Sequence, residues 1–374
     1  MVADEATRQL CELACRLDRN RHRVFLYALS EAVEPCASRL RAHDVAVTCF
    51  SRRHSWEPAR LLRLAGALRK DAIDVVHAAR PAGAVYGALA ARLSSVTTVL
   101  TAAREGERLP SGMSRRLLGD AYRRATAVVA NSSAYATQLA ATFALRQERT
   151  RVVYDGVDVA RFPAPSALDG LRERVRPGRP VVGAVGAPGM IEVFAAAAER
   201  VVARERQARF VWCGGSVGDR AEVERRMAAR GIPVILREGI QELADELPRL
   251  TFLWVLGSAH DEARAGVLAA MAAARPVVVL GGGGIEELVA DEVTGFVVGP
   301  EDVLALADLG VALLHDGARR REVGQAARAR AEREFAIDAT VRAMATLYEE
   351  AILGWLALAP RAIAPVTRDG VAIA

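Results

Sequence analysis

The chain has 374 residues, of which 52% are hydrophobic and 25% are charged, and its formal net charge is +5 at pH 7. This apolar content is sufficient for a sizeable core and excludes an intrinsically disordered protein. Its 30 glycines and 15 prolines are ordinary amounts, which excludes a collagen-like or low-complexity chain.

The first half of the chain alternates helical stretches with short β-branched runs. We expect helices near 5–19, 33–42, 56–70, 82–94, 113–125 and 133–144. The runs between them predict strands at 22–29, 45–50, 74–79, 97–102 and 127–131. Short strands that alternate with helices of about 10–15 residues are typical of βαβ units around a parallel sheet.

The second half repeats this alternation. Strands or strand ends are predicted at 180–186, 209–215, 232–239, 252–258, 276–284 and 294–300. A segment rich in Pro, Gly and Arg at 161–180 separates the halves and indicates a linker. We therefore predict an α/β protein with two Rossmann-like doubly wound domains that face a central cleft. The predicted domains are 1–165 and 166–352, followed by a loosely structured tail at 353–374.

Charge is unevenly distributed between the halves. Residues 1–165 carry 25 basic and 16 acidic side chains, and Lys70 is the only lysine of the chain. The segment 114–125 places arginines beside apolar side chains, which is typical of a helix lying on an anionic membrane, although a solvated helix face has the same pattern. Nucleic acid is not an expected partner, because aromatic residues make up only 5% and no binding motif accompanies the charge.

Cysteine and histidine do not form recognisable metal motifs. The five cysteines are an odd number without zinc spacing, so reduced, buried thiols are expected, and the six histidines are scattered. The start of the chain lacks the pattern of a secretion signal, and no apolar run approaches the length of a spanning helix. We expect a cytoplasmic protein, peripheral at the inner membrane face, without a metal ion.

Three strand ends of the second half carry glycine. Gly214 and Gly215 follow one strand, Gly257 and Ser258 follow another, and residues 281–284 are four glycines after a third. Glycine lets the backbone approach an anionic ligand, and a following helix offers unpaired amides. A nucleotide or diphosphate site is therefore predicted. Neither a P-loop nor a G-x-G-x-x-G after the first strand is present, which disfavours an NTPase or a simple dinucleotide enzyme.

Several segments resemble one family. VVANSSAYATQLA…TRVVYDGVDVARF (128–162), PVVVLGGGGIEELVADEVTGFVVGPED (276–302) and the stretch 319–350 resemble GT-B glycosyltransferases of family four, and 74–93 resembles their acceptor domain. The resemblance covers roughly residues 5–350. It implies a nucleotide-sugar donor held mainly by the second domain, and transfer to an acceptor with retention at the anomeric carbon. It also implies no resident cofactor and no required metal.

The chain departs from the family pattern at the donor. The family has two glutamates with seven residues between them, and the matching positions here are Asp261 and Ala269. Asp261 keeps the charge that faces the donor sugar, and the adjacent Glu262 is an alternative after a register shift. The family's Arg and Lys after the first strand of the donor domain have no counterpart in 182–194. Arg264 is the substitute cation that the sequence offers, with a solvated surface arginine as the alternative.

The acceptor half also departs from the pattern. The family's histidine after the fourth strand aligns near Ala103, where Arg104, Glu105 and Glu107 are the polar groups. His77 ends the third predicted strand and is a candidate catalytic group or, alternatively, a core histidine. Family members also open with a strand before the first helix, and this chain has none. Either the sheet closes up, or another segment fills the gap, or the recorded start is too late.

These observations predict a glycosyltransferase of polysaccharide biosynthesis whose acceptor is a glycan, a lipid or a small molecule. The candidate catalytic residues are Asp261, Glu262 and His77. The candidate donor-binding residues are Gly214, Gly215, Arg264, Gly283, Gly284 and Glu287, of which Glu287 matches the acidic member of the family's Gly-Gly-x-Pro-Glu run. A negative charge at a helix N-terminus is the alternative role of Glu287. The rival hypothesis is a non-catalytic GT-B-like scaffold that partners an active transferase, and an unrelated sugar-phosphate enzyme of the same fold is a third.

Overall fold

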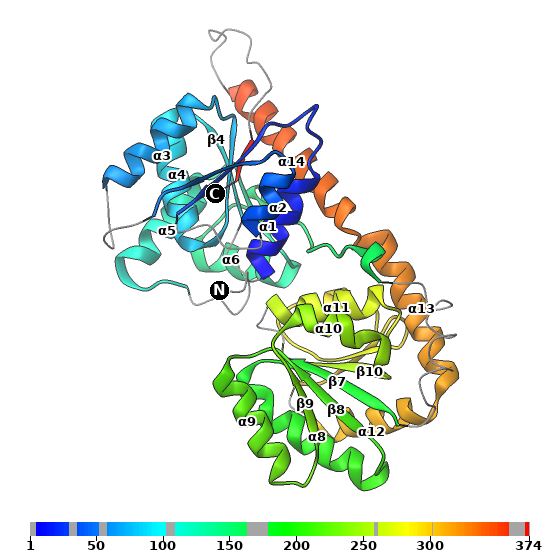
Figure 1. Ribbon diagram of the computed structural model, residues 1–374. Coiled ribbons are helices and arrows are strands. Elements are labelled where there is room, and N and C mark those ends of the chain that lie inside the picture. Colours follow the sequence, from blue (N-terminus) through cyan, green and yellow to red (C-terminus); the bar gives the residue numbers. More distant parts are fainter. Residues whose placement is uncertain are drawn as a thin grey trace. The chain divides into compact units, whose positions relative to one another are not determined.

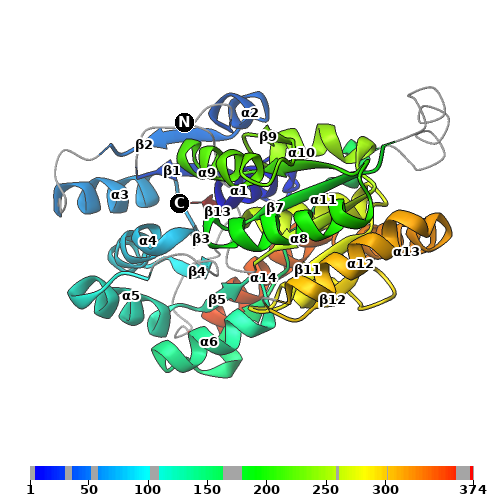
Figure 2. The same ribbon diagram turned by 90° about the horizontal axis from the view of Figure 1, so that it is seen from below.

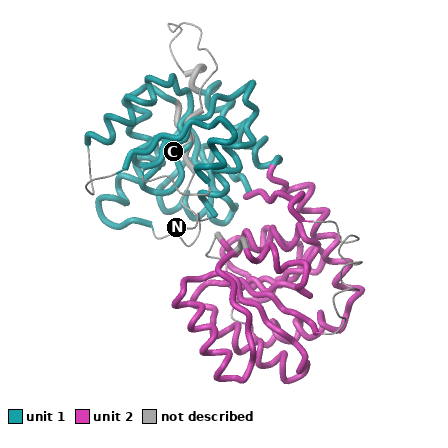
Figure 3. Tube along the Cα trace, in the orientation of Figure 1, with its two compact units in different colours: residues 1–154, 338–374 teal, residues 155–337 magenta. Residues whose placement is uncertain are grey.

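The computed structural model describes residues 5–29, 36–51, 58–101, 109–162, 179–257, 261–300, 302–358 and 371–373. The chain forms two compact α/β units, coloured separately in Figure 3. Unit 1 comprises residues 1–154 and 338–374, and unit 2 comprises residues 155–337. The predicted α/β class with two doubly wound sheets is confirmed.

The boundaries of the units differ from the predicted ones. Unit 1 ends at Tyr154 rather than near residue 165, and the chain returns to it at Asp338. The predicted loose tail at 353–374 is wrong at both of its ends, because a long helix continues to Leu358 and Val371–Ile373 form a strand. Local composition did not reveal these elements, since their partners lie hundreds of residues away in the sequence. Most of the linker at 161–180 lies outside the described residues.

Unit 1 is a parallel sheet covered by helices on both faces. Its strands are β1 (Val24–Ala28), β2 (Ala46–Cys49), β3 (Val75–Ala78), β4 (Thr97–Thr101), β5 (Ala127–Ala130), β6 (Thr150–Val152) and β13 (Val371–Ile373). Its helices are α1 (Glu5–Arg16), α2 (Cys36–Ala42), α3 (Pro58–Lys70), α4 (Arg80–Ser94), α5 (Gly112–Arg124), α6 (Ser133–Phe143) and α14 (Ile337–Leu358). The five strands predicted in this half are all present, whereas β6 and β13 were not predicted.

The strand order in unit 1 is β2-β1-β13-β3-β4-β5-β6. Figure 1 shows α3, α4 and α5 on one face of this sheet and α1, α2 and α14 on the other. Figure 2 shows β13 between β1 and β3, where a parallel pairing joins it to each neighbour. A segment from the other end of the sequence therefore occupies the place between β1 and β3, so the sheet does not close up there.

Unit 2 has a second parallel sheet. Its strands are β7 (Val181–Gly186), β8 (Arg209–Cys213), β9 (Val234–Arg237), β10 (Phe252–Leu256), β11 (Val277–Leu280) and β12 (Phe296–Val298). Its helices are α8 (Ile191–Arg204), α9 (Val217–Ala228), α10 (Ile240–Glu246), α11 (Asp261–Ala272), α12 (Val303–His315) and α13 (Gly317–Glu334). Short 3-10 turns η2 to η5 of this unit cover 159–161, 188–190, 247–249 and 285–288, and η1 at 147–149 belongs to unit 1. Every strand predicted in this half is present.

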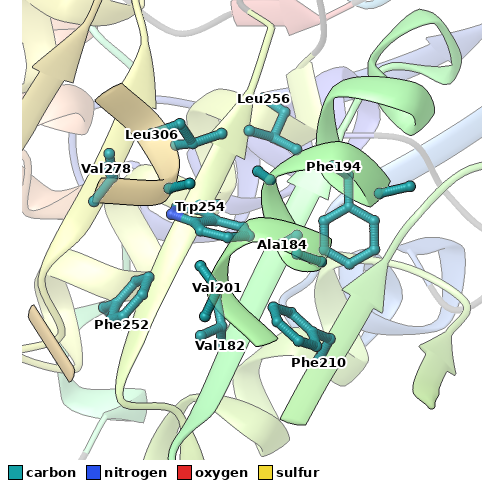
Figure 4. Packing of buried hydrophobic residues seen from close by; sticks show 14 of the residues in the cluster. Val182, Ala184, Phe194, Val201, Phe210, Phe252, Trp254, Leu256, Val278 and Leu306 are labelled. Atoms are coloured by element: carbon teal, nitrogen blue, oxygen red, sulfur yellow. The ribbon is translucent and has the colours of Figure 1, made fainter. Parts of the chain in front are cut away.

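The strand order in unit 2 is β12-β11-β10-β7-β8-β9, so the order reverses between β7 and β10. One face of the sheet packs an aromatic core in which the Phe194 ring lies 5.0 Å from Trp212 and 6.4 Å from Trp254 (Figure 4). Helices α8, α9 and α12 supply the side chains that cover this core. The packing fixes the sheet and therefore the edge at which its carboxyl ends meet.

Candidate functional site

Glycines gather at the carboxyl edge of the sheet in unit 2. Strand β7 ends at Gly186, while Gly214, Gly257 and Gly281 directly follow β8, β10 and β11. These strands are parallel, so all four glycines lie at one edge of the sheet, which is where open α/β sheets bind ligands. The predicted gathering of the glycine turns at one edge is therefore observed.

Gly214 lies against the carboxylate of Glu262. Its φ is +100°, which favours glycine, and a Cβ at this position would lie 2.5 Å from Glu262 Oε2, so the carboxylate would have to move. Glu262 is half-buried in the first turn of α11, and this contact brings its carboxylate to the end of β8. Asp261 is the first residue of the same helix, and its side chain lies outside the described part of the chain.

Helix α9 begins immediately after the glycine pair. The Ser216 hydroxyl accepts from the Asp219 N–H at 3.2 Å, and Asp219 accepts in return from the Ser216 N–H at 2.8 Å, which forms a capping box. Gly215, with φ of +80°, passes so close that an added Cβ would lie 2.9 Å from Asp219 Cβ. This cap fixes the position of the turn that carries the two glycines.

Arg220 is a cation at this turn that the sequence reasoning missed. Its Nη1 donates to the Gly215 carbonyl at 2.8 Å, and its Nη2 lies 3.4 Å from Glu238 Oε1. The side chain is 16% exposed, so it is held against the turn but still reaches solvent. The signal available in the sequence was its position in the first turn of a helix that follows Gly-Gly-Ser.

Cys213 ends β8 beside these residues but is not a nucleophile. Burial, followed by the nearby Glu246 carboxylate, raises the pKa of its thiol to about 12. Glu246 itself is buried and pairs with Arg237 at 2.6 Å. The thiol is therefore protonated at neutral pH.

The four-glycine turn after β11 has a left-handed backbone. Gly282, Gly283 and Gly284 have φ values of +128°, +67° and +81°. The Gly282 N–H donates to Glu286 Oε2 at 3.1 Å, so Glu286 closes the turn. The predicted residue Glu287 lies next to it with a half-buried side chain in η5, and its carbonyl accepts from Arg330 Nη2 at 3.1 Å. Sequence matching had identified only Glu287.

Arg264 holds the same turn from inside the protein. Its side chain is 2% exposed, and Nη1 donates to the Gly284 carbonyl at 3.1 Å. Nε lies 3.8 Å from Asp155 Oδ2, and Asp155 is itself buried. The alternative of a solvated surface arginine is therefore wrong, and the buried position is also unlike that of a cation presented to a diphosphate. Arg264 positions the glycine turn.

His77 lies in the core of unit 1, which corresponds to the core alternative rather than to a catalytic group. It is 3% exposed on β3, and its Nδ1 lies 2.7 Å from the Tyr348 hydroxyl of α14. Burial lowers the pKa of its imidazole to about 4, so the ring is neutral near pH 7. The region near Ala103, including Arg104, Glu105 and Glu107, lies outside the described residues.

No helix of the described ranges is both long and apolar enough to cross a membrane. In the same ranges, no group of three His, Cys, Asp or Glu side chains is placed to hold a metal ion. Ala269, at the position of the family's second glutamate, is 6% exposed on α11.

Two family models match the chain. Residues 6–161 match the model of Glycosyltransferase Family 4, and residues 179–316 match that of Glycosyl transferases group 1. Among curated proteins, D-inositol 3-phosphate glycosyltransferase of Salinispora tropica is 32% identical over 247 residues, which are 60% of this chain and 51% of the relative. Sulfoquinovosyl transferase of Arabidopsis thaliana is 26% identical over 306 residues, covering 75% of this chain and 58% of the relative. The chain thus spans about half the length of the curated relatives it matches.

Solved structures share the fold. Anabaena HepE, determined in complex with UDP and glucose, has a TM-score of 0.76 at 19% identity and covers 92% of this chain and 95% of its own. A glycosyltransferase from Rickettsia africae has a TM-score of 0.76 at 18% identity, with 94% and 96% covered. With two parallel doubly wound sheets and a family model matching each half, the chain belongs to the family-four glycosyltransferases of the GT-B fold.

Proposed function

We propose that the protein transfers a sugar from a nucleotide-sugar donor to an acceptor hydroxyl with retention, and that unit 2 binds the donor. The observation that carries this proposal is the Glu262 carboxylate held against Gly214 at the edge where the four-glycine turn also lies. The structures of Anabaena HepE with UDP and with UDP-glucose support a nucleotide-sugar ligand for this fold. The donor is already activated, so the proposed reaction uses no group-carrying cofactor, and we also propose that it uses no metal ion.

The chemistry assigns a role to each part of the edge. The bond between the anomeric carbon and the diphosphate oxygen breaks, the nucleoside diphosphate leaves with the electron pair, and the acceptor oxygen bonds to the same carbon as its proton passes to the departing diphosphate. The negative charge that develops on the leaving oxygen is stabilised by main-chain amides at Gly215, Gly283 and Gly284 and by Arg220, whereas the Gly214 N–H already donates to the Arg237 carbonyl. Asp261 and Glu262 contact the donor sugar, and Glu287 lies beside the second turn.

Donor binding is tested first. A panel of UDP-, GDP- and ADP-sugars is expected to raise the melting temperature in a nucleotide-dependent way, since a ligand that binds only the native state stabilises it. The anomeric configuration of the product, followed by NMR, tests retention, and excess chelator is expected to leave the rate unchanged. A flat response to every sugar nucleotide would contradict the proposal and favour the non-catalytic scaffold that partners another transferase.

The roles of the charged residues are tested by matched pairs. Glu262→Gln and Asp261→Asn are expected to lower kcat by at least about 100-fold, whereas Glu224→Gln, an exposed glutamate of α9, keeps wild-type activity. Arg220→Gln is expected to lower kcat/KM by at least about 10-fold. Its control is Arg225→Gln on the same helix, where the side chain is 68% exposed. Equal activities within a pair would remove that residue from the mechanism.

The acceptor is proposed to be a glycan or a lipid-linked molecule that approaches unit 1. Helix α5 exposes Met113 and Leu117, at 67% and 39% of their surface, beside the exposed arginines 115, 116, 123 and 124. This combination fits peripheral attachment to an anionic membrane, because apolar side chains insert at the interface while arginines pair with headgroups. Flotation with phosphatidylglycerol vesicles is expected to carry the protein, while phosphatidylcholine vesicles do not. Met113→Ser with Leu117→Ser is expected to reduce that binding.

A further inference from the structure

Strand β13 is the only hydrogen-bonded link between two parts of the sheet in unit 1, as far as its described strands show. On one side lie β2 and β1, and on the other lie β3, β4, β5 and β6. Val371, Ala372 and Ile373 pair in parallel with Val24, Phe25 and Leu26 of β1. The same three residues pair with Val75, Val76 and His77 of β3. The neighbouring strands would each expose an unpaired backbone edge without them.

The connectivity of the sheet is otherwise that of an ordinary doubly wound sheet. If β13 is counted as the first strand and β1 to β6 as the second to the seventh, the order across the sheet is 3-2-1-4-5-6-7. The helix that normally follows the first strand is α1, which is also the first helix of this chain. The position of the first strand is therefore filled by the last described segment.

Helix α14 is anchored to unit 1 independently of β13. The Tyr348 hydroxyl is hydrogen-bonded to His77 Nδ1 at 2.7 Å, and Arg16 Nη1 lies 3.0 Å from Asp338 Oδ1. Arg21 pairs with Glu349 farther along the helix. These contacts hold α14 on the face of the sheet that carries α1 (Figure 1).

We propose that the space between β1 and β3 is a strand-accepting slot and that the chain's own β13 occupies it as a separable strand, exchangeable for the same sequence supplied in trans. Three residues fill the slot. The strands on either side of it, β1 and β3, stay paired with β2 and β4 without it. Helix α14 has its own contact to β3 through Tyr348 and so does not need β13 to stay bound. The recognition is through the main chain, since a central parallel strand donates and accepts on both sides. This proposal goes beyond the transfer reaction and does not depend on it.

The slot also lies at a special place in the sheet. The strand order reverses between β13 and β3, and the carboxyl ends at such a reversal are where open α/β sheets bind ligands. Ile373 pairs with His77, one residue before β3 ends at Ala78. With β13 in the slot, the sheet is therefore continuous at the point where the strand order reverses.

The first test uses a chain that ends at Leu358 together with a synthetic peptide of residues 366–374. The shortened chain is expected to melt at a lower temperature and to lose amide protection at β1 and β3, while β5 and β6 keep theirs. Added peptide is expected to restore the melting temperature and the amide protection in a saturable way. The same peptide with Ala372→Pro is expected to restore neither. Wild-type melting and protection in the shortened chain would overturn the proposal, and so would a peptide that restores nothing.

The second test covers the case in which the shortened chain does not fold. In the full chain, Ala372→Pro removes one main-chain N–H donor. Ala372→Ser keeps this N–H and has a side chain of similar size. We expect the backbone amides of β1 and β3 to lose protection from exchange in the proline variant and to keep it in the serine variant. A permuted chain with residues 366–374 placed before Glu5 through a short Gly-Ser linker, and ending at Leu358, is expected to regain the wild-type melting temperature. Equal behaviour of the proline and serine variants, or an unfolded permuted chain, would contradict the slot.

Discussion

At the scale of single residues, Arg264 links a helix to the turn that the donor is proposed to contact. Its guanidinium is buried, bonds to Gly284 and lies near the buried Asp155. Removing one partner of a buried ionic contact leaves the other charge without its neighbour. We expect Arg264→Met to lower the free energy of unfolding by about 3–5 kcal/mol, measured by urea denaturation.

The control for Arg264 is a surface arginine of the same unit. Arg225 pairs with Glu222 but is 68% exposed, so Arg225→Met is expected to change stability by about 0.5 kcal/mol or less. The double variant Arg264→Met with Asp155→Asn is expected to lose less than the sum of the two single variants, because neither charge is then left alone. Similar losses for Arg264→Met and Arg225→Met would show that burial does not matter here.

His77 makes a prediction about pH. Burial lowers its pKa to about 4 in the folded protein, whereas an exposed histidine titrates near 6.5. The unfolded chain therefore binds more protons between these values, and stability is lost as pH falls from about 6.5 towards 4, by at most about 1.4 kcal/mol per pH unit. Above pH 6.5 the histidine contributes no pH dependence.

This dependence is measured by comparing the wild type with His77→Gln. The variant removes the titrating ring but retains a polar group that can reach Tyr348. Other groups titrate in both proteins, so the difference between their unfolding free energies isolates His77. We expect the difference to be flat above pH 6.5 and to change below it. Parallel curves from pH 7 to pH 4.5 would be inconsistent with a buried neutral ring.

At the scale of elements, the turn between β8 and α9 depends on glycine for a steric reason. Gly214 and Gly231 both have positive φ, but a Cβ at Gly214 meets Glu262 while a Cβ at Gly231 meets nothing within 4 Å. The two substitutions by alanine share the backbone penalty of about 1 kcal/mol. Only Gly214→Ala also displaces the Glu262 carboxylate.

We therefore expect Gly214→Ala to reduce donor affinity or turnover by at least about 10-fold, and Gly231→Ala to leave both unchanged at a similar loss of stability. Thermal unfolding gives the stability change, and steady-state kinetics with the identified donor gives the functional one. If both variants lost stability equally and both remained fully active, the contact between Gly214 and Glu262 would have no role in donor binding.

The elements also show what the sequence was able to predict. Strands such as β10 and β11 are continuous apolar runs rich in β-branched or aromatic residues, and their local pattern was sufficient. β6 and β13 were not predicted, because their places in the sheet are set by pairing with β5 and with β1 and β3, which no local pattern records. At the site, glycine spacing identified the turns, but the burial of Arg264, the contact of Arg220 with Gly215 and the use of Glu286 depend on tertiary packing that no local pattern records.

At the scale of the whole molecule, the two units differ in how their sequence is arranged. Unit 2 is one continuous segment, residues 155–337, with a complete parallel sheet and its own aromatic core. Unit 1 is discontinuous, because α14 and β13 come from the end of the chain and β13 joins the two parts of its sheet. The units should therefore behave differently when each is produced alone.

A fragment of residues 155–337 is expected to fold cooperatively and to keep the sugar-nucleotide thermal shift, because every donor residue proposed here lies within it. A fragment of residues 1–154 lacks β13 and α14, so it retains two unpaired strand edges and is expected to show no cooperative transition. Circular dichroism and calorimetry distinguish these outcomes. Adding residues 338–374 in trans is expected to restore a transition to the 1–154 fragment. Independent folding of that fragment would show that its sheet closes without the carboxyl-terminal elements, against the role assigned to β13.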